Sequence, residues 1–243
     1  MDEAKLKAIN VCVVEKEFKC AVCAKLFKNN IARKMKIRTL ESEVDLRPIC
    51  EPIDPTYYDV VICNHCGYST LLIFAEKKCS AIGLKLVREK VTPNFEYEEY
   101  PKILSGQDAL KRFKIAMNTA EAKNSDFGEK AYISLKTAWV YRSLQDKENE
   151  MIYLKQAASL FEKAYVEEEF PICQLDEPTF CYLVGAIYSL VEDYKSSLRW
   201  VSQVLVAGGG GVSPRLRERS FDLKVDVQNA LKKEEEAAAK AKG

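Results

Sequence analysis

Histidine is almost absent from this sequence of 243 residues, in which His65 is the only one. A single imidazole excludes metal sites that need several histidines, and nothing around His65 indicates a Ser-His-Asp or Cys-His catalytic site. The glycine patterns that cradle phosphates or dinucleotides are missing as well. The sequence therefore contains no motif that predicts catalytic or cofactor-binding residues.

Long apolar segments and an excess of either charge are also lacking. No run approaches the roughly 20 apolar residues of a membrane-spanning helix, and the charged start Met1–Lys5 leads into no apolar leader. Lys and Arg number 37 against 36 Asp and Glu, which gives no general reason to expect nucleic acid or a membrane as partner. With 47% hydrophobic and 30% charged residues, the composition is that of an ordinary globular protein, which we expect in the cytoplasm.

Cysteine, by contrast, occurs nine times. The odd count and the lack of an export signal argue against a disulfide framework. Four of the nine form two CxxC pairs, Cys20–Cys23 and Cys63–Cys66. Each CxxC turn directs two thiolates at one cation, and two such turns supply the closed tetrahedral shell of a structural zinc site. We predict a structural Zn²⁺ held by Cys20, Cys23, Cys63 and Cys66.

Other interpretations of these cysteines are weaker. A thioredoxin-like redox motif needs one pair in a βαβ context, and a catalytic zinc keeps one position open for water. The spacing is unusual, because residues 24–62 separate the pairs and a compact ribbon has only roughly 15 to 20 residues there. We therefore expect an inserted hairpin or loop. Within it, Cys50 is an alternative ligand, whereas His65 is expected to point away from the metal.

A basic segment in the same region raises a second possibility for function. From Lys19 to Arg38 the chain has no acidic residue, and Lys34–Arg38 alternates basic and apolar side chains like a half-exposed strand. Such a strand suits nucleic acid. An acidic run follows at once, from Glu41 to Asp59, and pairing with it would make the basic strand an ordinary solvated face. Nucleic acid stays the alternative partner rather than the favoured one.

The pattern of apolar residues predicts a mainly α-helical protein behind a small β-rich head. Val11–Val14 and Tyr57–Ile62 read as strands, and three prolines between residues 48 and 55 exclude a helix there. From Thr70 onward apolar residues recur at spacings of three and four, and Asp176 with Pro178 marks a helix start. The expected helices cover residues 71–90, 107–123, 128–144, 147–169, 176–190, 194–206 and 213 onward.

These elements suggest two domains. Residues 1–69 form the zinc-binding β-rich head, and residues 70–243 form a helical domain. We divide the latter into connecting helices at 70–125, paired repeat helices at 126–231 and a polar tail at 232–243, which is rich in Lys, Glu and Ala.

Two helix pairs carry part of the tetratricopeptide repeat (TPR) pattern. That pattern places small residues where the two helices cross and an aromatic residue in the space they leave. The matching positions are Ala138, Tyr141, Ala157, Phe161 and Ala164 in one copy, and Gly185, Tyr188, Ser197 and Val201 in the other. A plain α-bundle is the alternative architecture.

The order of these motifs resembles an uncharacterised bacterial family, domain of unknown function 2225. The resemblance rests on Phe18-x-Cys20-x-x-Cys23-x-x-x-Phe27, Ile53-Asp54-Pro55-x-Tyr57-Tyr58-Asp59-Val60, Cys63-x-x-Cys66-Gly67-Tyr68, Ala138-Trp139-x-Tyr141-Arg142 and Tyr182-Leu183-x-Gly185. It implies that the four cysteines are metal ligands and that the C-terminal half is TPR-like, and it implies no function. The chain departs from common zinc knuckles at Ala21 and Ala24, where proline and glycine are usual.

The leading hypothesis is a zinc-binding protein without enzymatic activity, whose TPR-like helices present a surface to a protein partner. A nucleic-acid-binding regulator that uses the basic strand is the alternative. A redox or zinc sensor is a third and weaker possibility.

Overall fold

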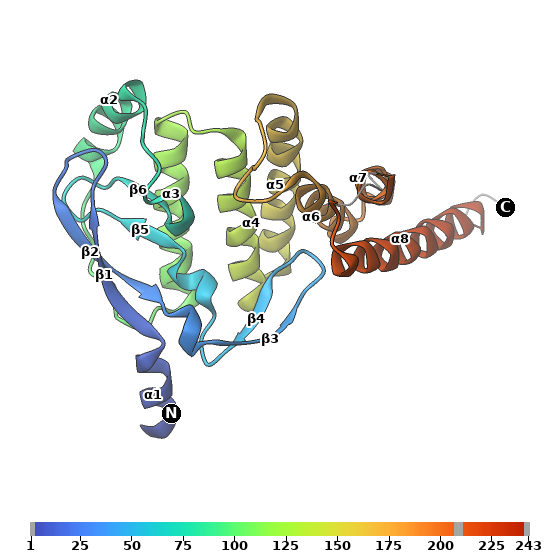
Figure 1. The fold of residues 1–243 in the computed structure, drawn as a ribbon, viewed down its shortest axis with the longest axis horizontal. Coiled ribbons are helices and arrows are strands. Elements are labelled where there is room, and N and C mark those ends of the chain that lie inside the picture. The colour runs from blue at the N-terminus through green and yellow to red at the C-terminus, as the bar shows by residue number, and fades with distance from the viewer. Residues whose placement is uncertain (1–2, 207–210, 241–243) are drawn as a thin grey trace.

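The computed structural model describes residues 3–206 and 211–240, and in this part six strands form three separate antiparallel pairs ahead of the long helices (Figure 1). Helix α1, Glu3–Val11, leads into the first pair. The strand pairs are β1 (Val13–Lys19) with β2 (Leu26–Ala32), β3 (Arg38–Ser42) with β4 (Pro48–Glu51), and β5 (Val60–Ile62) with β6 (Ser69–Leu71).

Seven further α-helices complete the described part of the chain. Several begin at a polar residue whose side chain accepts a hydrogen bond from the first turn, as Ser105, Asp146 and Asp176 do. The helices are α2 (Ala81–Lys90), α3 (Gly106–Ala122), α4 (Phe127–Ser143), α5 (Lys147–Glu167), α6 (Glu177–Leu190), α7 (Tyr194–Val206) and α8 (Pro214–Lys240). The predicted class, mainly α with a small β-rich N-terminal part, is confirmed. None of the helices in the described ranges is long and apolar enough to cross a membrane.

Four local predictions are wrong at least in part. The strand expected at Val11–Val14 begins only at Val13, because Val11 still belongs to α1. The strand expected at Tyr57–Ile62 is only Val60–Ile62, because Asp54 caps a 3₁₀ turn over Pro55–Tyr58 before it. The helix expected over 71–90 begins only at Ala81, where the Ser80 hydroxyl caps it, and Leu72–Phe74 is a 3₁₀ turn whose apolar side chains pack inward. The strand expected at Lys34–Arg38 is a 3₁₀ turn over Lys34–Lys36, and β3 starts at Arg38. Met35 is 98% exposed, so the segment has no buried face of the kind that makes an alternating pattern a strand.

The β-rich part and the helices share a hydrophobic core. Val60 and Ile62 of β5 and Leu71 of β6 are buried together with Phe113 of α3 and Val140 of α4. The sheet that carries the second cysteine turn therefore lies directly on the first long helices. The domain boundary at residue 69 stays a prediction.

Helices α4 to α8 are packed around a second core. Helix α6 approaches α7 closely at Gly185, where an added Cβ would lie 2.6 Å from Cγ2 of Val201. The Ser197 hydroxyl donates to the Gly185 carbonyl at 2.8 Å. In the α4–α5 pair, Ala157 and Phe161 are fully buried. The small residues of the predicted repeat positions thus lie at helix contacts, and the polar tail from Lys232 continues α8 as far as Lys240, with residues 241–243 outside the described part.

The β3–β4 hairpin, inserted between the two cysteine pairs, ties the head to the helices. It reaches away from the other two sheets toward the start of α8 (Figure 1). Asp45 in its turn is fully buried and accepts hydrogen bonds from Trp139 Nε1 at 2.9 Å and from Arg142 Nη2 at 2.8 Å. The Arg219 guanidinium of α8 donates to the carbonyl oxygens of Ser42 and Glu43.

Among the described residues, no carboxylate from Glu41 to Asp59 forms an ion pair with the basic segment Lys19–Arg38, so the pairing considered above is not found. Glu43 and Asp45 pair with Arg142 of α4, and Asp59 pairs with Lys136 of the same helix. Asp54 pairs with Arg47 inside the insertion. These carboxylates are drawn inward because buried cations on the helices need them.

Candidate metal centre

Each CxxC pair lies in the turn of a β-hairpin. In the β1–β2 turn, the N–H of Ala24 donates to the Cys20 carbonyl at 3.0 Å, and the Cys20 N–H donates to the Lys25 carbonyl at 2.9 Å. The β5–β6 turn repeats both bonds, from Gly67 to Cys63 at 2.9 Å and from Cys63 to Tyr68 at 2.8 Å. The last paired residues are Lys19↔Leu26 in one hairpin and Ile62↔Ser69 in the other. The two cysteine turns therefore have the same number of residues between their strands.

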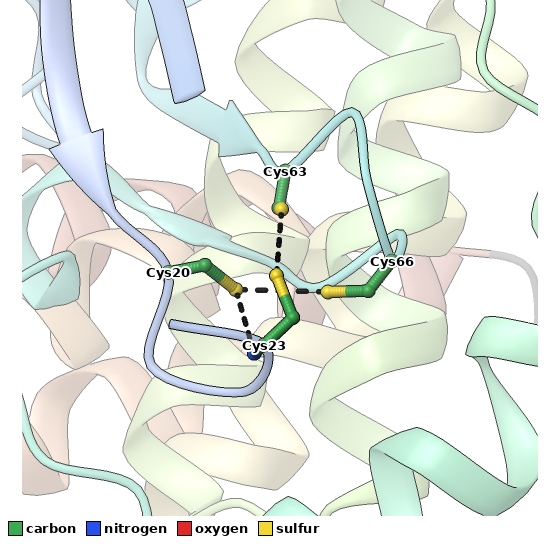
Figure 2. Close-up of side chains that lie close together, drawn as sticks. All are labelled: Cys20, Cys23, Cys63 and Cys66. Atoms are coloured by element: carbon green, nitrogen blue, oxygen red, sulfur yellow. Dashed lines mark hydrogen bonds between the residues drawn. The ribbon is translucent and has the colours of Figure 1, made fainter. Parts of the chain in front are cut away.

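The four cysteine sulfurs converge from these two turns (Figure 2). All four Sγ atoms lie within 4.8 Å of one another. Two contacts join one turn to the other, at 3.6 Å between the sulfurs of Cys20 and Cys66 and 3.7 Å between those of Cys23 and Cys63. A tetrahedral zinc site with Zn–S bonds near 2.3 Å has sulfur–sulfur edges of about 3.8 Å. The cluster can therefore hold a metal ion of this size and geometry.

The centre is enclosed by apolar side chains. Cys20, Cys63 and Cys66 are buried and Cys23 is half-buried. Phe18 and Phe27 stack on each other with ring centroids 5.6 Å apart. Further cover comes from Val22, Val61, Tyr68 and Val87. Leu26, next to Phe27 in the sequence, is 57% exposed and is not part of this cover.

The thiols interact with one another strongly. Hydrogen bonds from the thiols of Cys63 and Cys66 lower the pKa of Cys20 to about 2. The same contact with Cys20 raises the pKa of Cys63 to about 12 and also raises the pKa of Cys66. One thiolate is therefore stabilised by its neighbours, whereas four negative charges at this spacing require a cation.

Two side chains from the α2 region hold the turns, and sequence reasoning missed both. Arg88 Nη2 donates to the Val22 carbonyl of the first turn at 2.7 Å. Thr92, in the 3₁₀ turn Thr92–Asn94 after α2, donates from its hydroxyl to the Cys66 carbonyl at 3.0 Å. Neither residue belongs to a recognisable motif, because the contact depends on how α2 folds back over the hairpins.

The alternative ligands lie outside the cluster. His65 is exposed, and its Nε2 lies 3.0 Å from the Leu26 carbonyl oxygen. It is not part of the metal-binding cluster found among the described residues. Cys50 lies on β4, where its sulfur is 3.6 Å from the Thr39 hydroxyl. The structure thus brings together the four predicted cysteines, leaves out the alternative ligand Cys50, and places His65 outside the cluster as expected.

The comparisons place the chain in a family. A family model described as an uncharacterized protein conserved in bacteria, DUF2225, matches residues 13–226. The chain belongs to this family. The match starts at the first residue of β1 and ends within α8, so it includes both cysteine turns and the helices up to α8. No curated protein and no solved structure matches the chain.

The two turns of this DUF2225 site differ at one strained position. Ala24 has φ 61° and the equivalent Gly67 has φ 74°, both in the left-handed region that favours glycine. We expect Ala24→Gly to stabilise the zinc-loaded protein by about 1 kcal/mol, because the left-handed conformation is sterically unfavourable for alanine and not for glycine. Gly67→Ala should destabilise it by about 2 kcal/mol or more, since the new Cβ would also lie 2.4 Å from Phe95 Cγ.

Urea unfolding of both zinc-loaded variants measures these two changes. The two variants control for each other, because they exchange alanine and glycine in opposite directions at equivalent positions of the two turns. A loss of stability in Ala24→Gly would show that the first turn does not need the left-handed conformation.

Proposed function

We propose that this protein is a zinc-binding scaffold without enzymatic activity, in which a structural Zn²⁺ fixes the N-terminal hairpins and the helices bind a protein partner. The observation that carries the proposal is the approach of all four cysteine sulfurs to within 4.8 Å. Thiolate-only shells favour zinc among the common divalent ions, and four protein ligands leave no position for a substrate or a reactive water.

The metal would act through folding. The two turns are separated by residues 24–62, and each hairpin alone is too small to be stable in water. Binding of a structural zinc contributes on the order of 10 kcal/mol. This free energy is large enough to hold β1–β2 against β5–β6, and with them the inserted hairpin that contacts α4 and α8.

A groove between α3, α4 and α5 supports the assignment of a protein partner. It has a volume of about 540 Å³ and combines the apolar side chains of Leu110 and Met117 with Tyr141 and Tyr153. Its lining also includes the amide side chains of Gln107, Asn118 and Gln156, and the charged side chains of Lys111, Lys114 and Glu121. Amide and phenol groups can bond a peptide backbone while the apolar residues receive its side chains, so the occupant we propose is a peptide segment of another protein.

The test has a metal part and a partner part. Purified full-length protein should contain zinc in about a 1:1 ratio by atomic absorption. As bait, it should capture a defined partner that is lost from the double variant Lys114→Glu, Gln156→Arg, which alters two exposed residues of the groove. The control double variant Lys155→Glu, Ser159→Arg makes the same net change of charge at exposed positions of α5 outside the groove, and it should retain the partner.

Each part fails separately. A zinc-free protein that is fully folded would contradict the metal assignment. Equal loss of the captured protein from both double variants, or capture by neither wild type nor control, would contradict the groove as the partner site.

A further inference from the structure

A small cavity beside β5 has the character of an anion site. It lies between β2, α3 and the loop 97–104, has a volume of about 50 Å³ and is lined by polar side chains that can donate hydrogen bonds. These donors are Lys28, Asn30, Tyr97, Tyr100 and Arg112. No Asp or Glu is among its lining residues, although the whole chain has 36 acidic and 37 basic residues.

Arg112 is the central group of this cavity. It is 5% exposed, yet it forms no ion pair within the described ranges 3–206 and 211–240. Its Nη2 donates to the Val60 carbonyl and to Asn29 Oδ1, whereas its buried Nε has no hydrogen-bond partner. Burial lowers the pKa of Arg112, and no carboxylate of the described residues lies within ion-pair distance to oppose this.

The charge of the nearest acidic residue along the helix offsets only a small part of the effect of burial on the pKa of Arg112. Asp108, one turn before Arg112, directs its carboxylate to the backbone N–H and the hydroxyl of Ser105, at 2.8 and 2.6 Å, and so caps α3. By contrast, the buried Lys136 and the half-buried Arg142 each form an ion pair with a carboxylate. An arginine buried without one is costly unless an anion completes the site.

Tyr100 supplies a second unsatisfied donor. Its ring lies 5.0 Å from the Arg112 guanidinium, and its hydroxyl is buried without a hydrogen-bond partner among the described residues. Burial raises the pKa of Tyr100, so the hydroxyl keeps its proton and can donate it. Lys28, exposed and 2.9 Å from Glu15, adds a basic group on the solvent side of the cavity.

We propose that this cavity binds a small oxyanion, the phosphate or carboxylate group of a small molecule, through the Nε–H of Arg112 and the O–H of Tyr100. An oxyanion would satisfy both buried donors and neutralise the guanidinium at once. The hydrogen bonds to Val60 and Asn29 explain how Arg112 fastens α3 to the β-rich part, but they account for neither orphaned donor. The site is separate from the cysteine cluster, and none of its donors is a cysteine.

Titration calorimetry of the zinc-loaded full-length protein tests this assignment, with inorganic phosphate, acetate and chloride as probes at constant ionic strength. Saturable binding of phosphate or acetate, and not of chloride, is the expected result, and the stronger of the two identifies the anionic group. Tyr100→Phe keeps the ring over Arg112 and should weaken binding about tenfold, because a hydrogen bond to a charged acceptor is lost. Arg112→Lys should weaken it at least as much.

Lys111→Gln is the matched control, since Lys111 is the neighbour of Arg112 on α3, is paired with Glu98 and lines a different groove. It should bind the anion like the wild type. Zinc content and circular dichroism establish that each variant is folded. If Arg112→Lys does not fold, the result for Tyr100→Phe alone decides whether the anion binds here. Absence of saturable binding by the wild type, or unchanged binding by Tyr100→Phe, would overturn the proposal and leave Arg112 with a structural role alone.

Discussion

Replacing Cys63 by serine is expected to release the metal and to unfold the β-rich head. Cys63 is fully buried and its sulfur lies 3.7 Å from that of Cys23, so no water or neighbouring side chain can take its place. Serine is a poor zinc ligand at neutral pH because its hydroxyl stays protonated. We expect the zinc content to fall by roughly tenfold or more, since most of the binding free energy of about 10 kcal/mol depends on the complete shell.

Atomic absorption and circular dichroism distinguish this outcome from general misfolding. Cys50→Ser is the control, because Cys50 is a half-buried cysteine of the same N-terminal region outside the cluster, and it should keep its zinc. Helices α4 to α8 have a hydrophobic core of their own, so we expect most of the helical signal to survive in Cys63→Ser. An unchanged zinc content in this variant would show that the four cysteines are not the metal site.

The metal centre could be predicted from the sequence because its chemistry is local. A CxxC turn specifies the direction of two thiolates within four residues, and only the distance between the turns had to come from the fold. Helix starts such as Asp176 with Pro178 were readable for the same reason, since a cap and its partner lie within one turn. The Gly185–Val201 contact was likewise indicated by residue size.

Features that depend on distant packing could not be predicted. Leu72 and Ala75 have helical spacing, yet they pack against the cysteine cluster from a 3₁₀ turn and the bend after it, because α2 must start later to fold over the hairpins. The orphaned donors of Arg112 and Tyr100 become visible only when α3 meets the loop before it. The acidic run carried no local sign that its partners lie on α4, more than 70 residues further along the chain.

Asp45 shows what the long insertion between the cysteine pairs does. Its carboxylate is fully buried and receives the indole N–H of Trp139, the guanidinium of Arg142 and, at 3.4 Å, the backbone N–H of Arg47. Burial by itself lowers the pKa of Arg142, but the hydrogen bond and charge of Asp45, followed by Glu150 and Glu43, raise it above its usual range. The insertion is therefore a clamp, closed by a carboxylate that neutralises a cation of the helical core.

Asp45→Ala is accordingly expected to destabilise the protein by about 2 to 3 kcal/mol. It leaves the indole N–H of Trp139 without its acceptor and removes one of the three carboxylates that pair with Arg142, of which Glu43 and Glu150 remain. Asp126→Asn is the matched control: Asp126 also pairs with a cation, Lys77, but both side chains are more than half exposed, so the change should cost less than about 1 kcal/mol. Urea unfolding of the zinc-loaded variants measures both. Equal stabilities would mean that the hairpin is a dispensable insertion. A large loss confined to Asp45→Ala, with zinc content unchanged, would show that the metal and the clamp fix the head to the helices independently.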